Sequence, residues 1–307
     1  MVRLKGPLFG HDARGILAGI LTYRRGGRAH SAYPYVKAKF PHTPAQIRHH
    51  ALFSLLAARW GALPPPARTC WSDLARPHRL TNYNAYLSYH LTRLNSRVLD
   101  GLIGWWPNLC PIGDTLYDLS TSANPGTWFG PSDHWVDSPY GYASLYTPPN
   151  AYVQVGNLDI FKFTGDFTVA YHFQSVATAN QVAVSKWTGL GSGSQWWIHV
   201  LSGKIRAGVY TPDPMVTIFQ SNVPAGSGRW SHVALVRDGA VGHLYVDAVD
   251  THTLPVGVGV CGQNAAPLTF GNFNGATGSW PYDGLLRDVR IYDRALSPGE
   301  VTSLSLH

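Results

Sequence analysis

Two kinds of side chain in this sequence could act on a ligand: its carboxylates and its tryptophans. Hydrolysis of a glycosidic bond needs two carboxyl groups, one as acid and one as nucleophile or base. The sequence holds a single glutamate, Glu300, near its end. The aspartate pairs considered instead are Asp247 with Asp250 and Asp283 with Asp288. We therefore expect no catalytic residues.

Other catalytic and metal-binding patterns are missing from the sequence. It contains neither Gly-x-Ser-x-Gly nor His-Glu-x-x-His, and its fourteen histidines do not pair with cysteine at metal-ligand spacing. His49 and His50 are typical of a helix surface. We expect no metal site and no cofactor.

Eleven tryptophans are many for 307 residues. Sugars present apolar CH faces that pack on aromatic rings, while their hydroxyls need polar partners. Trp196 and Trp197 follow a Gly-Ser segment, so on a strand one indole points into the core and the other outward. Trp105 and Trp230 are expected in the core. The candidate ligand-binding residues, most of them beside Gly, Pro or Asp, are Trp187, Trp128, Trp135, Trp280 and Trp197.

Residues 229–296 are typical of antiparallel strands. Apolar residues alternate through 230–237 and 244–246, and Asp238-Gly239 supplies a tight turn between them. A further strand follows over 284–292. Each of these strands is predicted to bury one face.

The order of five segments resembles a laminin G-like, concanavalin A-like jelly roll over residues of about 100 to 300. They are 101–107, with Gly-Leu-Ile-Gly-Trp-Trp-Pro, the Asp-Leu-Ser of 118–120, and 165–171, 230–239 and 283–296. The resemblance implies two antiparallel sheets and a fold that often binds glycans. The Glu-x-Asp-x-x-Glu signature of its glycosidase members has no counterpart here. The resemblance also implies that Asp247, Asp250, Asp283 and Asp288 lie at turns or strand ends.

Many members of that family hold calcium at the sheet edge, and this sequence departs from their pattern at both positions. Tyr146 and Thr147 stand where the family has Asp-Gly, and Arg287 replaces the first of two adjacent acids. A cationic side chain opposes a hard cation. The resemblance therefore implies no calcium at the family site.

A smaller α+β region is expected before the jelly roll. The stretches 16–23 and 29–40 flank a glycine pair and predict a β-hairpin with Arg24, Arg25 and Arg28 at its tip. Three short helices should follow. The first begins at Thr43 and ends before the prolines of 64–66, the second carries Trp71 and Leu74, and Thr81 caps the third, which runs to about Ser96.

This region also resembles the N-terminal part of phage and prophage virion proteins. The matching features are the Gly-rich segment 13–19, the Thr-Pro-Ala-Gln of 43–46, and a second helix with Trp71. We thus predict two domains, residues 1–99 and residues 100–307.

Charge divides the chain at the same boundary. Residues 1–99 hold fifteen Lys and Arg against two acids, whereas residues 100–307 hold nine against fifteen, giving +13 and −6. Arg24, Arg25 and Arg28 are the candidate anion-binding or assembly residues, and a solvated basic surface is the alternative. Sequence-specific DNA binding is disfavoured, because no single helix concentrates the residues that read base edges.

The beginning of the chain has no apolar signal segment, and no apolar run is long enough to cross a membrane. Three cysteines allow one bridge at most, and Cys110 with Cys261 is the pair considered. We expect a virion or another extracellular particle surface as the location.

The preferred interpretation is a noncatalytic structural and adhesive protein, either a phage decoration or fibre protein or a self-assembling filament subunit. Its basic region would join copies of the chain or other virion proteins, and its jelly roll would display a binding surface. A soluble carbohydrate-binding module is the second hypothesis, and a glycoside hydrolase is the third.

Overall fold

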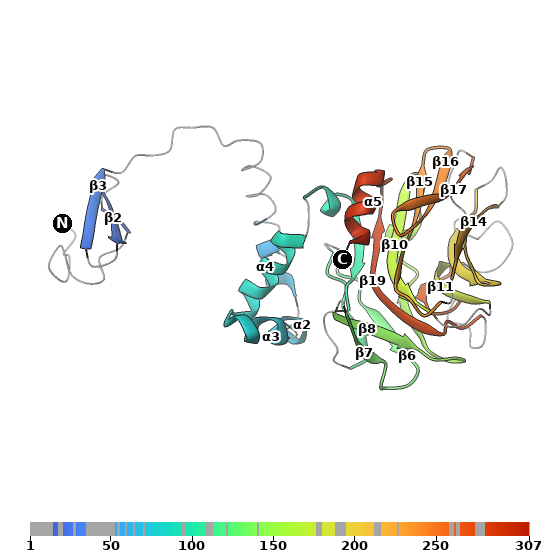
Figure 1. Ribbon diagram of the computed structural model, residues 1–307, viewed down its shortest axis with the longest axis horizontal. Coiled ribbons are helices and arrows are strands. Elements are labelled where there is room, and N and C mark those ends of the chain that lie inside the picture. The colour runs from blue at the N-terminus through green and yellow to red at the C-terminus, as the bar shows by residue number, and fades with distance from the viewer. Residues whose placement is uncertain are drawn as a thin grey trace. The chain divides into compact units, whose positions relative to one another are not determined.

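A computed structural model describes most of the chain, and its compact parts fall into two units, residues 1–47 and 48–307 (Figure 1). The predicted boundary between independently folding domains at residue 99 stays a prediction. The described residues are 15–17, 21–26, 29–34, 53, 56–58, 60–63, 65–69, 71–93, 96–108, 113–120, 122–139, 141–175, 180–187, 195–211, 216–225, 227–257, 261, 265–273 and 280–306.

The first unit contains a three-stranded antiparallel sheet, in the order β1 (Gly15–Leu17), β2 (Leu21–Gly26) and β3 (Ala29–Pro34). Gly26 pairs with Ala29, which confirms the hairpin. Arg24 and Arg25 lie within β2 and pair with Ser31 and His30, so they are not in the turn. Arg28, like the helix expected at Thr43, lies outside the described residues.

The second unit begins with short helices. They are α2 (Pro65–Thr69), α3 (Ser72–Ala75), the 3₁₀ turn η1 (Arg76–His78), α4 (Asn82–Arg93) and the 3₁₀ turn η2 (Ser96–Leu99). Thr81 caps α4 as predicted, because its Oγ1 accepts a hydrogen bond from the Asn84 backbone. The residues before the prolines are helical up to Ala62 and leave the helix at Leu63, as predicted. Pro65 then begins α2, a position where the missing N–H of proline costs little.

Two antiparallel sheets make up the rest of the unit and confirm the predicted jelly roll. The first sheet has the order β17-β16-β15-β10-β19-β8-β7, and β4 also pairs with β19. Its strands are β4 (Leu102–Trp106), β7 (Trp135–Ser138), β8 (Gly141–Tyr146), β10 (Phe167–Gln174), β15 (Ser231–Asp238), β16 (Val241–Val246), β17 (Val249–Pro255) and β19 (Gly284–Tyr292).

The second sheet has the order β14-β13-β12-β11-β18-β9-β6-β5. Its strands are β5 (Thr115–Leu116), β6 (Gly126–Phe129), β9 (Tyr152–Gly156), β11 (Gln181–Lys186), β12 (Trp196–Leu201), β13 (Lys204–Val209), β14 (Thr217–Pro224) and β18 (Leu268–Phe270). A 3₁₀ turn, η3 (Asp159–Phe161), follows β9, and α5 (Pro298–Ser305) follows the last strand.

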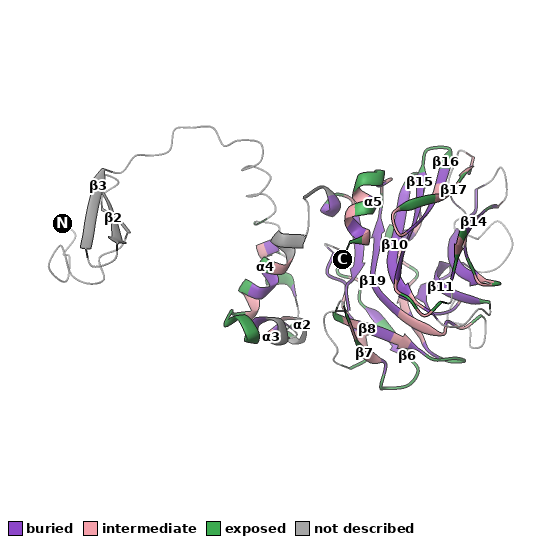
Figure 2. Ribbon diagram, viewed as in Figure 1, coloured by how far each residue is buried: buried purple, intermediate pink, exposed green. Residues whose placement is uncertain are grey.

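The main core fills the space between the sheets. Alternate residues of facing strands, such as Val169 and Val233 on one sheet and Ile198 and Ala207 on the other, belong to one buried cluster (Figure 2). Trp196 is fully buried there. The expectation for Trp230 was wrong, because this residue is only partly buried.

A second buried cluster covers the other face of the first sheet. It joins Ala170, Ala234 and Tyr292 of the sheet with Val301 of α5 and Trp71 of the helical segment. Figure 1 shows α5 beside β10 and β19. The outward face of this sheet is therefore covered by the chain's own helices.

Cys261 is a buried thiol and not part of a disulfide. Cys110, the other cysteine of the pair considered, lies outside the described residues. Within the described part of the chain, no helix is both long enough and apolar enough to span a bilayer.

Candidate functional site

The second sheet turns its other face outward. A row of residues in register crosses all eight strands on this face: Thr115, Thr127, Gln154, Thr269, Ser185, Trp197, Gly208 and Ile218. Their neighbours along each strand, such as Val153 and Ile198, belong to the core. This row therefore points away from the core, as the two-residue period of a strand requires.

Aromatic rings gather on one part of this face. Trp187 meets Trp197 edge to face at 5.9 Å, and the Trp197 ring lies 4.1 Å from that of His199. His199 lies 5.2 Å from Trp280, which in turn lies 5.6 Å from Phe273. We call these five residues the aromatic cluster. Tyr210 packs beside Trp187 and Trp197.

Three of the five predicted tryptophans thus come together, although they are distant in sequence. Trp197 and Trp187 are only 6% and 8% exposed, whereas Trp280 is 37% exposed and forms the accessible edge of the cluster. Trp280 also has a positive φ of 50°, which is uncommon for a residue with a side chain. Its carbonyl accepts a hydrogen bond from the Val182 backbone N–H, which holds Trp280 beside the start of β11.

Gly208 makes room for the Trp197 ring. It lies directly opposite Trp197 on β13, and a Cβ placed there would lie 2.3 Å from the indole Cε2. The indole therefore lies over the glycine backbone. A side chain at this position would push the ring away from His199.

Several polar groups beside the cluster have no hydrogen-bond partner among the residues that the structure describes. Both ring nitrogens of His199, both amide atoms of Gln195 and the Nε of Arg206 are buried and unpaired. Gln195 is fully buried and His199 is 4% exposed. A buried polar atom left unpaired costs about 1–3 kcal/mol, so these groups beside an accessible indole require an explanation.

His199 is neutral at physiological pH. Burial, assisted by the positive charge of Arg206, lowers its pKa from 6.5 to about 3. A neutral imidazole carries one N–H donor and one acceptor nitrogen. This side chain can therefore both donate to and accept from a hydroxyl group.

Trp128 and Trp135 do not belong to the aromatic cluster. Trp128 is 5% exposed, stacks on His134 at 4.1 Å and donates to the Pro131 carbonyl. Trp128 and Trp187, two of the candidate ligand-binding residues, are thus buried against neighbouring rings. Trp135 is partly exposed, and its indole donates to the Gly113 carbonyl.

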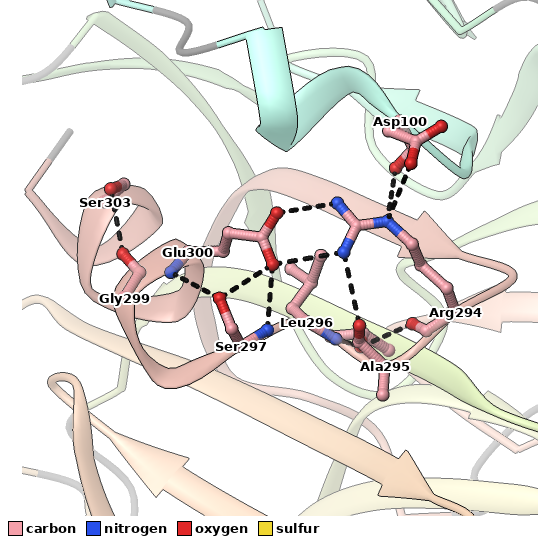
Figure 3. Close-up of polar contacts among 9 residues, drawn as sticks. Asp100, Arg294, Ala295, Leu296, Ser297, Gly299, Glu300 and Ser303 are labelled. Carbon is pink, nitrogen blue, oxygen red and sulfur yellow. Dashed lines mark hydrogen bonds and ion pairs between the residues drawn. The ribbon is translucent and has the colours of Figure 1, made fainter.

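The carboxylates considered for catalysis have other partners. Glu300 forms an ion pair with Arg294 and a reciprocal cap with Ser297 at the start of α5 (Figure 3). Asp247 lies in the β16–β17 turn and pairs with Arg229. Asp250 accepts from Thr253.

Asp288 was wrongly assigned to a turn or strand end. It lies inside β19 at a bulge, with a φ of 53°, where the pairing with β10 shifts register. Arg290 donates to both of its carboxylate oxygens, and the Trp105 indole donates to Oδ1 at 2.6 Å. Although burial alone would raise the pKa of Asp288, the neighbouring Arg290, His172 and Arg287 hold it below the usual range.

Arg287 is buried beside Asp288, and the carboxylate is occupied by internal donors. Among the described residues, no group of His, Cys, Asp or Glu is placed to hold a metal ion.

Two facing antiparallel sheets with Greek-key strand order define a lectin-like jelly roll. The sequence also matches a laminin G model, described as the Concanavalin A-like lectin/glucanases superfamily, over residues 147–302. The chain belongs to this superfamily. No curated protein sequence matches the chain.

Solved structures share the fold at low identity. The binding domain of Paraclostridial Mosquitocidal Protein 1 is 15% identical with a TM-score of 0.54, over 68% of this chain and 52% of that one. The botulinum neurotoxin serotype D binding domain is 13% identical with a TM-score of 0.52, over 69% and 52%. A botulinum neurotoxin type C structure is 14% identical, with a TM-score of 0.50 over 69% and 52%. The chain spans about half the length of these structures.

Sequence reasoning missed His199, Arg206, Gln195 and Gly208. A signal for two of them was available: Gln195 and His199 lie two residues before and two residues after Trp197, so all three side chains must share one face of the strand. Arg206 and Gly208 become part of the site only through the register of β12 with β13.

Proposed function

We propose that this protein is a noncatalytic, lectin-like binding protein whose carbohydrate site is the aromatic cluster on the outer face of the second sheet. One observation carries the proposal: an accessible indole, Trp280, adjoins buried polar groups that have no partner within the described protein. Aromatic surface beside fixed donors and acceptors is the combination that sugars require.

The chemistry assigns a role to each group. A pyranose would place its CH face against Trp280, and its hydroxyls would bond to the neutral His199. The amide of Gln195 offers a further donor and acceptor next to Tyr210. Rings held by packing lose little conformational freedom on binding, which favours affinity.

The fold supports a binding role. The similar solved structures include toxin binding domains, and the type C botulinum neurotoxin enters cells through interaction with two ganglioside molecules. For the present chain we infer glycan recognition of a comparable kind. The partners found for Glu300, Asp247 and Asp288 support a noncatalytic role, and a glycoside hydrolase remains the alternative that release of reducing sugar would reveal.

The test compares two tryptophan variants of the full chain on a glycan array and by calorimetry. Trp280→Ala keeps the backbone carbonyl that binds Val182 but removes the indole. Trp135→Ala is the matched control, since it removes a partly exposed indole from the first sheet. We expect Trp280→Ala to weaken binding by about tenfold or more, because stacking contributes about 1–3 kcal/mol, and the control to bind normally. Equal binding by both variants would refute the site.

We also propose that residues 1–99 join copies of this chain or other virion proteins, which would place the jelly roll on a phage or other particle surface. The charge of +13 in this region against −6 in the remainder supports contact between copies. Arg24, Arg25 and Arg28 are the first residues to change. A triple Arg→Glu variant of the full chain should lose oligomers seen by light scattering at 150 mM salt. A chain that is monomeric before substitution would contradict assembly.

A further inference from the structure

Arg206 lies at the centre of the polar part of the outer face. It stands directly opposite His199 on β12 and opposite Gln220 on β14. Its strand neighbours Ile205 and Ala207 belong to the core, so its side chain points outward with His199. Adjacent strands lie about 5 Å apart, which places the guanidinium next to the aromatic cluster.

The charge of Arg206 is not neutralised by any described residue. Three other arginines of the jelly roll have a carboxylate partner: Arg229 pairs with Asp247, Arg290 with Asp288, and Arg294 with Glu300. Arg206 forms no such ion pair within the described ranges, and its buried Nε has no hydrogen-bond partner. Only the Nε of Arg206 belongs to the buried atoms without a partner, so its two terminal nitrogens remain available to bind an anion.

The surroundings of Arg206 are positive as well. Lys204 is exposed two residues earlier on the same strand and therefore shares the face. The pKa of His199 is lowered first by burial and then by the charge of Arg206, and no carboxylate of the described residues contributes to the shift. The polar end of the site thus presents two cations and a neutral imidazole.

We propose that the ligand is an acidic glycan, whose carboxylate or sulfate group binds Arg206 while an adjacent ring packs on Trp280. A guanidinium binds both oxygens of such a group in one plane. The N–H of His199 supplies a further donor between the anion and the indole. This inference rests on the proposed carbohydrate site and names the class of glycan that the site takes.

The experiment measures the affinity of the full chain for N-acetyllactosamine and for its 3′-sialylated and 3′-sulfated forms at 150 mM salt. Wild type should bind one or both acidic sugars about tenfold more tightly than the neutral parent, the gain typical of a hydrogen-bonded charge pair. Arg206→Gln should abolish that preference, so that this variant binds the acidic and the neutral sugars with equal affinity. Lys204→Gln, which removes a neighbouring exposed charge, should keep it. The sialylated and sulfated arms distinguish a carboxylate from a sulfate.

The outcomes separate the two proposals. Trp280-dependent binding without any preference for acidic sugars would overturn the present inference and leave the proposed function in place. A preference that survives in Arg206→Gln would also overturn it, as would an equal loss of neutral and acidic binding in that variant. Absence of Trp280-dependent binding to every sugar would refute the proposed function and the inference together.

Discussion

The two outer faces of the jelly roll use similar residues in different ways. On the first sheet, Arg290 binds Asp288 with two hydrogen bonds and lies 5.0 Å from the Trp105 ring, beneath helices of the same chain. On the second sheet, Arg206 adjoins aromatic rings but has no carboxylate partner among the described residues. The first face supplies a carboxylate to its arginine and is covered by helices of the same chain, whereas Arg206 on the second face has no such ion pair within the described ranges. Both faces hold buried polar atoms without a hydrogen-bond partner among the described residues, such as His232 Nδ1 on the first and His199 Nδ1 on the second. This difference distinguishes a packing surface from a candidate binding surface.

The largest expected effect is on the first face. Asp288→Asn would leave Arg290 and Arg287 buried without their counter-charge, at a cost of about 3–5 kcal/mol in unfolding free energy. Urea denaturation would measure this loss. Asp250→Asn is the control, because its exposed carboxylate bonds only to neighbours at the surface. A loss below about 1 kcal/mol for Asp288→Asn would mean that the ion pair does not stabilise the covered face.

Acid should also affect the covered face. Burial lowers the pKa of His172 to about 4, with Arg287 and Arg290 adding to the effect and Asp288 opposing it. The unfolded chain takes up the proton near pH 6.5, so it binds more protons than the folded chain between pH 6.5 and about 4. Stability is therefore full above pH 6.5 and falls as pH decreases through this window.

Thermal unfolding at a series of pH values measures this dependence. Burial also lowers the pKa of His232, whose ring lies 4.8 Å from that of His172, so both histidines contribute in the same direction. His172→Gln should make the melting temperature less dependent on pH between 6.5 and 4. An unchanged slope in that variant would exclude His172 as a cause of the acid sensitivity.

Substitutions at two glycines, one facing the core and one facing the site, should separate effects on stability from effects on binding. A Cβ at Gly242 would lie 2.4 Å from Phe219 in the core, whereas one at Gly208 would displace the Trp197 indole on the outer face. Gly242→Ala should lower stability by about 1–3 kcal/mol through overpacking. Gly208→Ala should cost less stability and should weaken glycan binding several-fold, measured by calorimetry at a temperature where both variants are folded. If Gly208→Ala bound glycan as tightly as wild type, Trp197 would have no role in the site.

Much of the fold could be predicted from the sequence, because alternation and turn residues act locally. Asp118 is an example: the predicted turn forms because its carboxylate accepts the backbone N–H groups of Ser120 and Asn124. The candidate site was harder to predict from the sequence than the fold. Trp187 and Trp280 are brought together by strand order, and Arg206 meets His199 only through register, which depends on long-range pairing. Asp288 at the bulge was missed for the same reason.

The smallest expected effect concerns Glu300, the sole glutamate. Burial opposes its ionisation, but hydrogen bonds from Arg294 and Ser297 lower its pKa from 4.5 to about 2. Its contribution to stability is therefore present above pH 4.5 and is lost as pH falls toward 2. Glu300→Gln keeps a side chain that can cap α5 and removes only the charge, so we expect a loss of about 1 kcal/mol or less at pH 7. Glycan binding should be unchanged, because Glu300 lies with α5 on the covered side. A selective loss of binding or of sugar release in this variant would assign the glutamate to a ligand site and undo the distinction between the two faces.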